Sequence, residues 1–462
     1  MVWQPEIDEL NYRKELAAQM GGPEGVERQH KRGKLTIRER IEKFADPGSF
    51  REIGSIAGSG RYENNELVSF LPANSVVGIC ELDGRKVALS GGDFTVRGGA
   101  ADAAVGNKGG YAVRQALEWR MPYIRLLDAT GGSVRTFEQI GRTYIPDANS
   151  YCAEEGRLLS VAPVVSAVMG SVAGLPAVEA CFAHFNLMVK GTSQLFPGGP
   201  PVVKAALGYD VTKEELGDER TQVYQGGVID NLAESEEDAF AIIRRFLSYL
   251  PSNVWEMAPR TEPTDDPNRC EEGLLSIIPR KRTRAYDPRK ILDWVLDRDS
   301  FFEIAPHAGP SRITGFARLN GYPVGCMTNN PMHLGGSMDM AAGQKVIRFM
   351  QICDVFHLPM IYFADEPGFM VGLEAQRMGI VRAGARAVLA TCNTRMPWAT
   401  VVTRQLFGVA GQLHSRPGGM FKRVAWPSGH WGSMHIEGGA SAAYRREIEA
   451  AADPEAKRAE FE

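Results

Sequence analysis

The sequence lacks both an excess of charge of one sign and a long apolar run. It has 52 Lys and Arg against 56 Asp and Glu, a net charge of −4 over 462 residues. Such a balance gives no electrostatic attraction to nucleic acid or to an anionic membrane surface. No stretch reaches the run of about 18 apolar residues that a membrane-spanning helix needs. We therefore expect neither a nucleic-acid partner nor a membrane partner.

Cysteine is scarce and scattered. The seven cysteines are odd in number, and no two of them form a C-x-x-C pair, which argues against a disulfide framework and against a zinc site. Free, mostly buried thiols in a reducing compartment are expected instead. Residues 1–10 are acidic and lack the apolar segment of a signal or transit peptide. These features predict a cytoplasmic protein with no metal site.

The common catalytic motifs are missing as well. There is no G-x-S-x-G, no G-x-x-x-x-G-K-[ST] and no H-E-x-x-H, so the sequence predicts neither a serine-hydrolase elbow, a phosphate loop nor a zincin helix. Lys34 follows a glycine but lacks the hydroxyl residue that a phosphate loop requires. Asp365 and Glu366 are adjacent, so we expect them to point apart rather than to form a carboxylate dyad. His430 and His435 are spaced for no common ligand arrangement.

Glycine, in contrast, is abundant. Its 50 residues exceed the average usage of about 7% and show no three-residue period, which excludes collagen. The excess indicates turns at positive φ, or backbone that lies close to another group.

A long internal repeat accounts for part of this glycine. At an offset of 237 residues, the D-x-A-x-G-x-K motif that ends at Lys108 recurs in the motif that ends at Lys345, and the register continues without a gap through two strand ends. An earlier match has an offset of 251, which predicts 14 extra residues in the first copy, around residues 61–72. Two unrelated α/β units would share apolar periodicity but not the same Asp, Lys and Gly, so duplication is favoured.

Each copy shows the same order of elements. A helix (108–119; 345–356), a buried strand (123–127; 360–364), a second helix (147–158; 377–392) and a second buried strand (164–169; 398–405) follow one another, and both strands end in glycine turns. This alternation predicts parallel strands with crossover helices. Residues 257–284 are rich in Pro and charge and are predicted to form a linker, so we expect domains at 1–258 and 259–462.

The glycine turns carry the chemistry that this pattern can offer. Turns that follow neighbouring parallel strands can aim backbone N–H groups at one developing oxyanion, although tight structural turns are the simpler alternative. The candidate donors are Gly131, Gly132, Ala173 and Gly174 in the first copy, and Gly368, Phe369, Val409 and Ala410 in the second. Lys108 and Lys345 could contact an anionic ligand or lie on a solvated helix face. Asp128 and Asp365 could cap the following helices or belong to a site.

Several segments together resemble one family. They are Gln29–Ile41 with its Gly33-Lys34-Leu35-Thr36 core, the run 46–50, the strand and turn at 185–196, the segment 210–217 and the turn 367–372. In this combination the chain resembles the carboxyltransferase (beta) subunits of biotin-dependent acyl-CoA carboxylases, of the propionyl-CoA and methylcrotonyl-CoA type. The resemblance implies an α/β fold of tandem, duplicated crotonase-like domains.

The resemblance also implies a reaction. A carboxyl group moves between carboxybiotin, held on a separate carrier protein, and the α-carbon of an acyl-CoA thioester, and the cofactor supplies the base. The first domain would stabilise the acyl-CoA enolate and the second would serve carboxybiotin. From the repeat and its turns, we also expect Gly408, Gly411, Lys108 and Lys345 to contact the ligands. Implied partners are a biotin carboxylase, a biotin carboxyl carrier protein and further copies of the chain in a dimer-based hexamer.

Three features depart from the family pattern. The second-domain turn carries Val409 where the family usually has glycine, and a Cβ disfavours positive φ. The segment from Gln412 to Met420 lacks the usual acidic positions that discriminate between acyl groups. Residues 452–462 match a point at which family members continue, so the second domain is expected to be shortened. The alternatives are a biotin-dependent acyl-CoA decarboxylase subunit and a catalytically silent assembly subunit.

Overall fold

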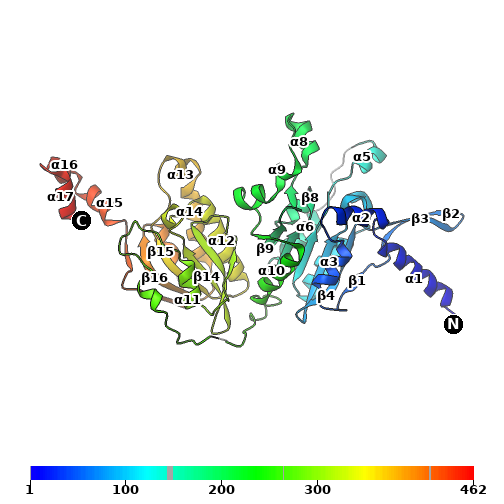
Figure 1. Cartoon of the computed structure of the whole chain (residues 1–462), viewed down its shortest axis with the longest axis horizontal. Helices are drawn as coiled ribbons and strands as arrows, with labels where there is room; N and C mark the ends of the chain where they lie inside the picture. Colours follow the sequence, from blue (N-terminus) through cyan, green and yellow to red (C-terminus); the bar gives the residue numbers. More distant parts are fainter. Residues whose placement is uncertain (1, 143–148, 264, 416–417) are drawn as a thin grey trace. The chain divides into compact units, whose positions relative to one another are not determined.

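The computed structural model describes residues 2–142, 149–263, 265–415 and 418–462. The chain divides into two compact units, Met1–Ala258 and Pro259–Glu462. Each unit is built on a seven-stranded mixed sheet with helices packed against it (Figure 1).

The first unit has the sheet order β1-β4-β5-β6-β7-β9-β11. β1, β4 and β5 pair antiparallel, and the strands from β5 to β11 run parallel. The bounds are β1 Arg51–Ile53, β4 Ser75–Leu82, β5 Arg85–Gly92, β6 Tyr123–Leu127, β7 Val164–Val168, β9 Phe185–Val189 and β11 Asn231–Ala233. β6, β7 and β9 are buried along their whole length, as expected for parallel strands covered on both faces.

The second unit repeats this plan. A short antiparallel strand and a hairpin lead into parallel strands, in the order β12-β13-β14-β15-β16-β17, with β18 also paired to β16. The bounds are β12 Phe302–Ile304, β13 Arg312–Leu319, β14 Tyr322–Asn329, β15 Met360–Glu366, β16 Trp398–Phe407, β17 Phe421–Ala425 and β18 His430–Gly432. The common topology agrees with the duplication inferred from the sequence.

The extra chain in the first copy forms a separate hairpin, β2 (Gly58–Glu63) with β3 (Glu66–Pro72), at the place where the change of offset predicted an insertion. A second small sheet pairs β8 (Ser171–Ala173) with β10 (Gln194–Phe196) in parallel. β8 occupies the segment that the sequence suggested was only a turn.

Helices complete both units. The first contains α1 Gln4–Ala18, α2 Gly22–Lys31, α3 Ile37–Phe44, α4 Lys108–Trp119, α5 Val134–Ile140, α6 Asn149–Leu158, α7 Leu175–Glu179, α8 Pro200–Leu207, α9 Lys213–Gly217 and α10 Glu236–Ser248. The second contains α11 Arg289–Val295, α12 Met340–Val355, α13 Leu373–Arg377, α14 Ile380–Asn393, α15 Ile436–Ala443, α16 Arg445–Ala450 and α17 Pro454–Phe461.

Three expectations about these elements were wrong in detail. α12 begins five residues before Lys345, because the Asp339 side chain accepts a hydrogen bond from the Ala342 N–H and caps the helix there. The helix predicted at 377–392 is instead two helices, interrupted at Gly379, whose φ is 83°. Of the helix predicted at 147–158, residues 147 and 148 lie outside the described residues.

The connector and the cysteines also differ from expectation. Residues 257–284 are not a simple linker, because Leu274 and Ile278 pack against the core of the second unit. None of the seven cysteines forms a disulfide, as expected. Only Cys80, Cys326 and Cys353 are fully buried, however, so the thiols are not mostly buried.

Candidate active site

The two glycine turns of the first unit lie against each other. Gly131 has a φ of 72°, and a Cβ atom there would lie only 2.5 Å from the carbonyl oxygen of Ala173. Gly174 has a φ of 71°, and a Cβ built on it would lie 3.9 Å from the Gly131 Cα. The parallel pairing of β6 with β7 brings the turns together. Glycine is required at residue 131 both by its conformation and by this close approach.

The donors that remain unused belong to one turn rather than to both. The Ala173 N–H donates to the Ala129 carbonyl at 3.1 Å, and the Gly174 N–H donates to the Phe196 carbonyl at 3.3 Å. The N–H groups of Gly131 and Gly132 donate to no acceptor among the described residues. The expectation of one donor from each turn therefore becomes an adjacent pair on the first turn, with Ala173 packed beside it.

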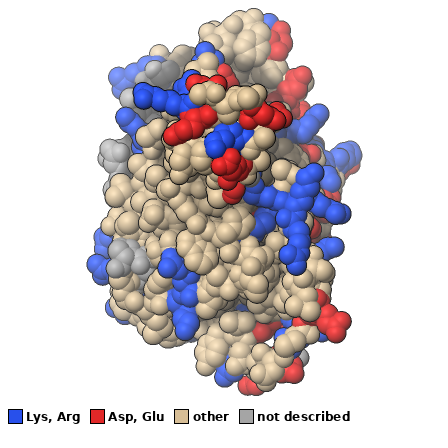
Figure 2. Space-filling view, turned by 90° about the vertical axis from the view of Figure 1, so that its left-hand side faces the viewer, with Lys and Arg blue, Asp and Glu red and all other residues tan. Residues whose placement is uncertain are grey.

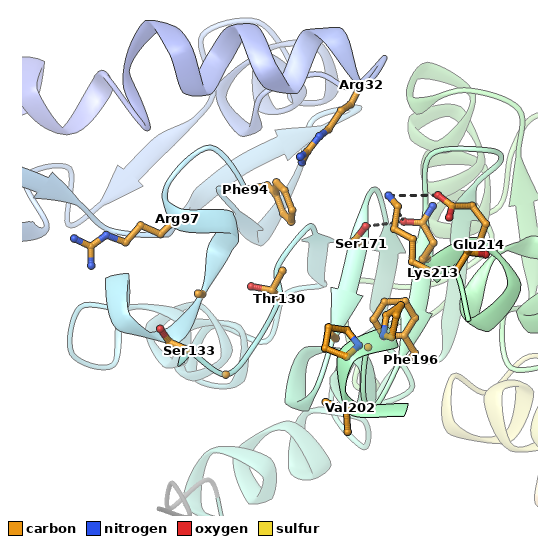
Figure 3. A pocket seen from close by; sticks show the side chains of 18 of the residues that line it. Arg32, Phe94, Arg97, Thr130, Ser133, Ser171, Phe196, Val202, Lys213 and Glu214 are labelled. Atoms are coloured by element: carbon orange, nitrogen blue, oxygen red, sulfur yellow. Dashed lines mark hydrogen bonds and ion pairs between the residues drawn. The ribbon is translucent and has the colours of Figure 1, made fainter. Parts of the chain in front are cut away.

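A cavity of about 1260 Å³ opens beside this pair and includes Gly132 and Ala173 in its lining. Figure 3 shows side chains from distant parts of the sequence converging on it, among them Phe94, Thr130, Phe196 and Val202. Its basic lining residues are Arg32, Lys34, Arg97, Arg135 and Lys213. Apolar walls with several cations suit a ligand that is partly apolar and carries negative charge.

The cations of the cavity differ in how strongly they are engaged. Arg32 and Lys34 lie over the Phe94 ring, at 5.4 and 4.4 Å from its centroid. Arg97 forms an ion pair with Asp102 at 2.6 Å. Arg135, on α5, is exposed and has no ion pair with any described residue. Arg135 is therefore the cation that a ligand can engage without breaking an existing contact.

The polar wall around β8 and β10 is hydrogen-bonded. Ser171 donates to the Gln194 side-chain oxygen at 2.6 Å, and Lys213 approaches the same oxygen at 3.3 Å (Figure 3). The Thr192 hydroxyl, which also lines the cavity, is buried and lacks a hydrogen-bond partner among the described residues. Unsatisfied buried hydroxyls are uncommon, so Thr192 is available to a bound ligand.

Asp128 and Asp365 do not cap helices. α5 begins after Ser133 and α13 after Gly372, and neither aspartate contacts those helix ends. Both are fully buried: Asp128 pairs with Lys34 and Arg40, and Asp365 with Arg404. The helix-cap expectation was wrong because cations distant in the sequence reach each carboxylate.

In the second unit, the corresponding turns also leave N–H groups unused. Glu366 lies opposite Leu406 in the pairing of β15 with β16, so the two strands end side by side. The N–H groups of Phe369, Val409 and Ala410 donate to no acceptor among the described residues. The Gly368 N–H donates to the Glu366 carboxylate at 2.9 Å, so this predicted donor is already used.

Val409 fits its turn without strain. Its φ is −68°, in the right-handed region, and the positive φ of 64° belongs to Gly408. The Gly408 N–H donates to Gly432 on β18, and the Gly411 N–H donates back to Gly408. The concern that a Cβ at residue 409 would distort the turn is therefore removed. The Val409 side chain is 65% exposed.

The two lysines of the repeat motif hold structural contacts. Lys108 forms an ion pair with Glu52 at 3.3 Å, and its pKa is lowered by burial. Lys345 is buried and donates to the Arg312 carbonyl at 2.7 Å. Neither lines the cavity of the first unit. Asp365 and Glu366 do point apart, to Arg404 and Arg312 respectively. No group of three metal-ligating side chains occurs among the described residues.

Residues 28–462 match the carboxyl transferase domain family. The chain belongs to this family. It is 36% identical to the propionyl-CoA carboxylase carboxyltransferase subunit of Haloferax mediterranei over 463 residues, covering 100% of this chain and 89% of the relative. It is 32% identical to the methylmalonyl-CoA decarboxylase subunit alpha of Veillonella parvula, and the match covers 99% of this chain and 89% of the relative.

The fold comparison agrees. The carboxyltransferase matches the crystal structure of transcarboxylase 12S, described as a hexamer with methylmalonyl-coenzyme A bound, with a TM-score of 0.87 and 30% identity over 98% of this chain and 87% of that one. The expected crotonase-like α/β fold and carboxyltransferase activity are confirmed. No described helix has the length and apolar character to cross a membrane.

Sequence reasoning missed the basic lining of the cavity. Arg32, Arg97 and Arg135 come from separate segments, and only the folded sheet brings them to one opening. A weak signal existed for Lys34, which stood out as a glycine-flanked lysine, although its position in the cavity wall depends on a carboxylate 94 residues away.

Proposed function

We propose that the first unit binds the acyl-CoA thioester and that the second unit binds the biotin of a carrier subunit. A carboxyl group is then transferred between the biotin and the α-carbon of the thioester. The observation that carries this proposal is the unused N–H pair of Gly131 and Gly132, at the rim of a basic cavity. Two adjacent donors can stabilise negative charge on the thioester oxygen when the α-proton leaves. Backbone N–H groups do not titrate, so they serve over a wide pH range.

The cavity suits the remainder of such a substrate. Arg135 and Lys213 provide charge for the phosphates of coenzyme A, and Phe94 and Phe196 provide apolar surface. A volume of about 1260 Å³ exceeds the roughly 300–1,000 Å³ of common ligand pockets, as a long nucleotide thioester requires.

The donors of the second unit fit the ureido group of biotin. Phe369, Val409 and Ala410 present N–H groups that no described residue uses, and these can hold its carbonyl oxygen. When bound, biotin supplies the carboxyl group and the nitrogen that takes the α-proton. The residues of the chain bind, orient and stabilise charge, which explains the absence of the common catalytic motifs.

Exposed apolar side chains in the second unit support self-association. Val371, Leu373, Val381 and Val409 are each at least 65% exposed. Figure 2 shows a broad area of one side of this unit with few charged side chains. Exposed apolar side chains are compatible with an interface between subunits, and we include in the proposal a dimer-based hexamer that works with biotin carboxylase and biotin carrier subunits.

The test is carboxyl transfer from methylmalonyl-CoA or malonyl-CoA to free biotin, followed by release of propionyl-CoA or acetyl-CoA. We expect turnover that requires biotin. Absence of turnover with these donors and with 3-methylglutaconyl-CoA would contradict the proposal and support a silent assembly subunit.

A decarboxylase subunit is the second candidate, because of the 32% identity to the Veillonella parvula protein. The two functions share the transfer step and differ in their partners. Reconstitution with biotin carboxylase and carrier subunits separates them: ATP- and bicarbonate-dependent carboxylation of propionyl-CoA supports the carboxylase, and its absence in the presence of biotin transfer supports the decarboxylase.

A further inference from the structure

A buried carboxylate ties together the two strand ends beneath the candidate oxyanion turns of the first unit. Asp128 directly follows β6 and is fully buried. Its oxygens accept hydrogen bonds from Lys34 at 2.8 and 2.9 Å, from Gln29 at 3.0 Å and from Arg40 at 3.1 Å. Three residues later the chain reaches Gly131.

The same carboxylate is in contact with the neighbouring turn. A Cβ atom on Gly170, directly after β7 and Met169, would lie 2.0 Å from the Asp128 Oδ1. Arg40 also donates to the Met169 carbonyl at 2.9 Å. Asp128 and Arg40 together therefore span the ends of β6 and β7, which lead into Gly131 and Ala173.

The position of Arg40 is fixed by a second carboxylate, that of Glu236. Arg40 is fully buried, and its Nε and one terminal nitrogen donate to the two oxygens of Glu236, each at 2.8 Å. Burial alone lowers the pKa of Arg40, but the hydrogen bonds and charges of Glu236 and Asp128 outweigh burial and raise it. The guanidinium is thus permanently charged and fixed in position between Glu236, Asp128 and the Met169 carbonyl.

In the second unit, a buried aspartate also connects two neighbouring strand ends, but its partners are different residues. Asp365, at the position equivalent to Asp128, is fully buried and accepts from Arg404 at 3.1 Å, from Gln405 at 3.1 Å and from the Tyr286 hydroxyl at 3.0 Å. Arg404 and Gln405 belong to β16, so the carboxylate again ties one strand end to the next. Gly368 follows three residues later.

Folding stability explains this arrangement poorly. Burying an ion pair costs several kcal/mol of desolvation per ion, and an apolar replacement of similar volume is often neutral or stabilising. Both units nevertheless hold a buried carboxylate at the same strand position, although its cations come from α3 and the preceding loop in one and from β16 in the other. The shared element is the connection between the two strand ends.

We propose that Asp128, acting through Arg40, is a positioning residue that sets the spacing of the turns at Gly131 and Ala173, and that Asp365 does the same beneath Gly368 and Val409. This inference rests on the proposed oxyanion role of those turns. Neither aspartate contacts substrate. Each acts by holding backbone donors where charge develops.

The test compares full-length variants by isotope-edited infrared spectroscopy of bound [1-¹³C]propionyl-CoA. In the native protein we expect the thioester carbonyl stretch to shift to lower frequency than in solution, because N–H donors polarise it. In Asp128→Asn and in Arg40→Lys the shift should shrink, and kcat for transfer from methylmalonyl-CoA to biotin should fall roughly 10- to 100-fold. KM for the acyl-CoA should stay within about threefold.

Two controls separate positioning from general loss of stability. Arg125 is also buried and paired, with Glu155, and it donates to Ser166 in the middle of β7 rather than at the strand end, so Arg125→Lys should lower the melting temperature and retain the carbonyl shift. Asp365→Asn should lower kcat and raise KM for biotin while also retaining that shift. Arg40→Lys keeps the positive charge, so it reports on positioning even where Asp128→Asn does not fold.

The outcomes are distinct. A folded Asp128→Asn or Arg40→Lys variant with the native carbonyl shift and native kcat would overturn the positioning role. A carbonyl frequency in the native protein equal to that in solution would instead overturn the proposed oxyanion function of the first unit.

Discussion

Gly131→Ala is the most direct test of the turn geometry. A residue with a Cβ at a φ of 72° pays about 1–2 kcal/mol for the left-handed conformation. In addition, the new Cβ would lie 2.5 Å from the Ala173 carbonyl oxygen. Because the obstructing atom belongs to the backbone, no side-chain rotation relieves the contact.

The size of the displacement follows from these distances. An ordinary carbon–oxygen contact is about 3.3 Å, so the two turns must separate by roughly 0.8 Å. A misplacement of about 1 Å at a reacting centre can cost about 100-fold in rate. We therefore expect kcat for transfer from methylmalonyl-CoA to biotin to fall roughly 100-fold in Gly131→Ala.

A matched control exists in the same unit. Gly141, at the end of α5, also has a positive φ, of 66°, but a Cβ there would have no heavy atom of a described residue within 4 Å. Gly141→Ala should therefore lose about 1–2 kcal/mol of stability and keep native kcat. Steady-state kinetics and thermal unfolding of both variants suffice. A folded Gly131→Ala protein with kcat within threefold of native would refute the argument from the close approach of the turns.

Three further predictions concern single side chains. Val409→Gly should change kcat by less than about threefold and cost about 0.5–1 kcal/mol of stability, because the native φ is already −68°; a large gain in rate would contradict this. Arg135→Ala should raise KM for the acyl-CoA roughly two- to fivefold with kcat unchanged. The difference in KM should diminish in 0.5 M salt, because the Debye length there is only about 4 Å and the charge of Arg135 is screened. Burial, with a smaller contribution from Glu155, raises the pKa of Glu179 from 4.5 to about 7, so this group lowers the folding stability progressively as the pH rises from about 4.5 to about 7. Relative to the native protein, Glu179→Gln should then gain up to about 3 kcal/mol at pH 8 and less than about 1 kcal/mol at pH 5, as measured by thermal unfolding. An equal effect at both pH values would be inconsistent with this pKa.

The strands and turns were accessible from sequence because they depend on local pattern and on an ungapped repeat. The predicted bounds of α4 and β6 coincide with those of the structure. Internal comparison pointed to Gly131 and Ala173 as parts of two turns, and parallel pairing implied that they meet. These inferences needed only periodicity and the rule that successive parallel strands end at one edge of a sheet.

The sequence pattern could not predict which of the candidate N–H groups are already hydrogen-bonded within the protein. The Ala173 N–H donates to the Ala129 carbonyl, and the Gly368 N–H donates to the Glu366 carboxylate. Such hydrogen bonds depend on backbone direction after a turn, which residue types at fixed spacing do not specify. The partners of Asp128 were inaccessible for another reason: Lys34 and Arg40 lie 94 and 88 residues away from it in the sequence, and no spacing rule links them to it.

Comparison of the two units shows which part of the site is independent of side-chain identity. The buried aspartates occupy the same strand position, but their cations have different origins, Lys34 and Arg40 in the first unit and Arg404 in the second. The donors beside them are backbone N–H groups, whose positions depend on φ and on strand pairing. Substitution of side chains in either copy can therefore reshape the surrounding pocket without removing the donors. Under the proposed function, duplication of such a unit would supply backbone donors of the same kind to the thioester oxygen and to the ureido carbonyl.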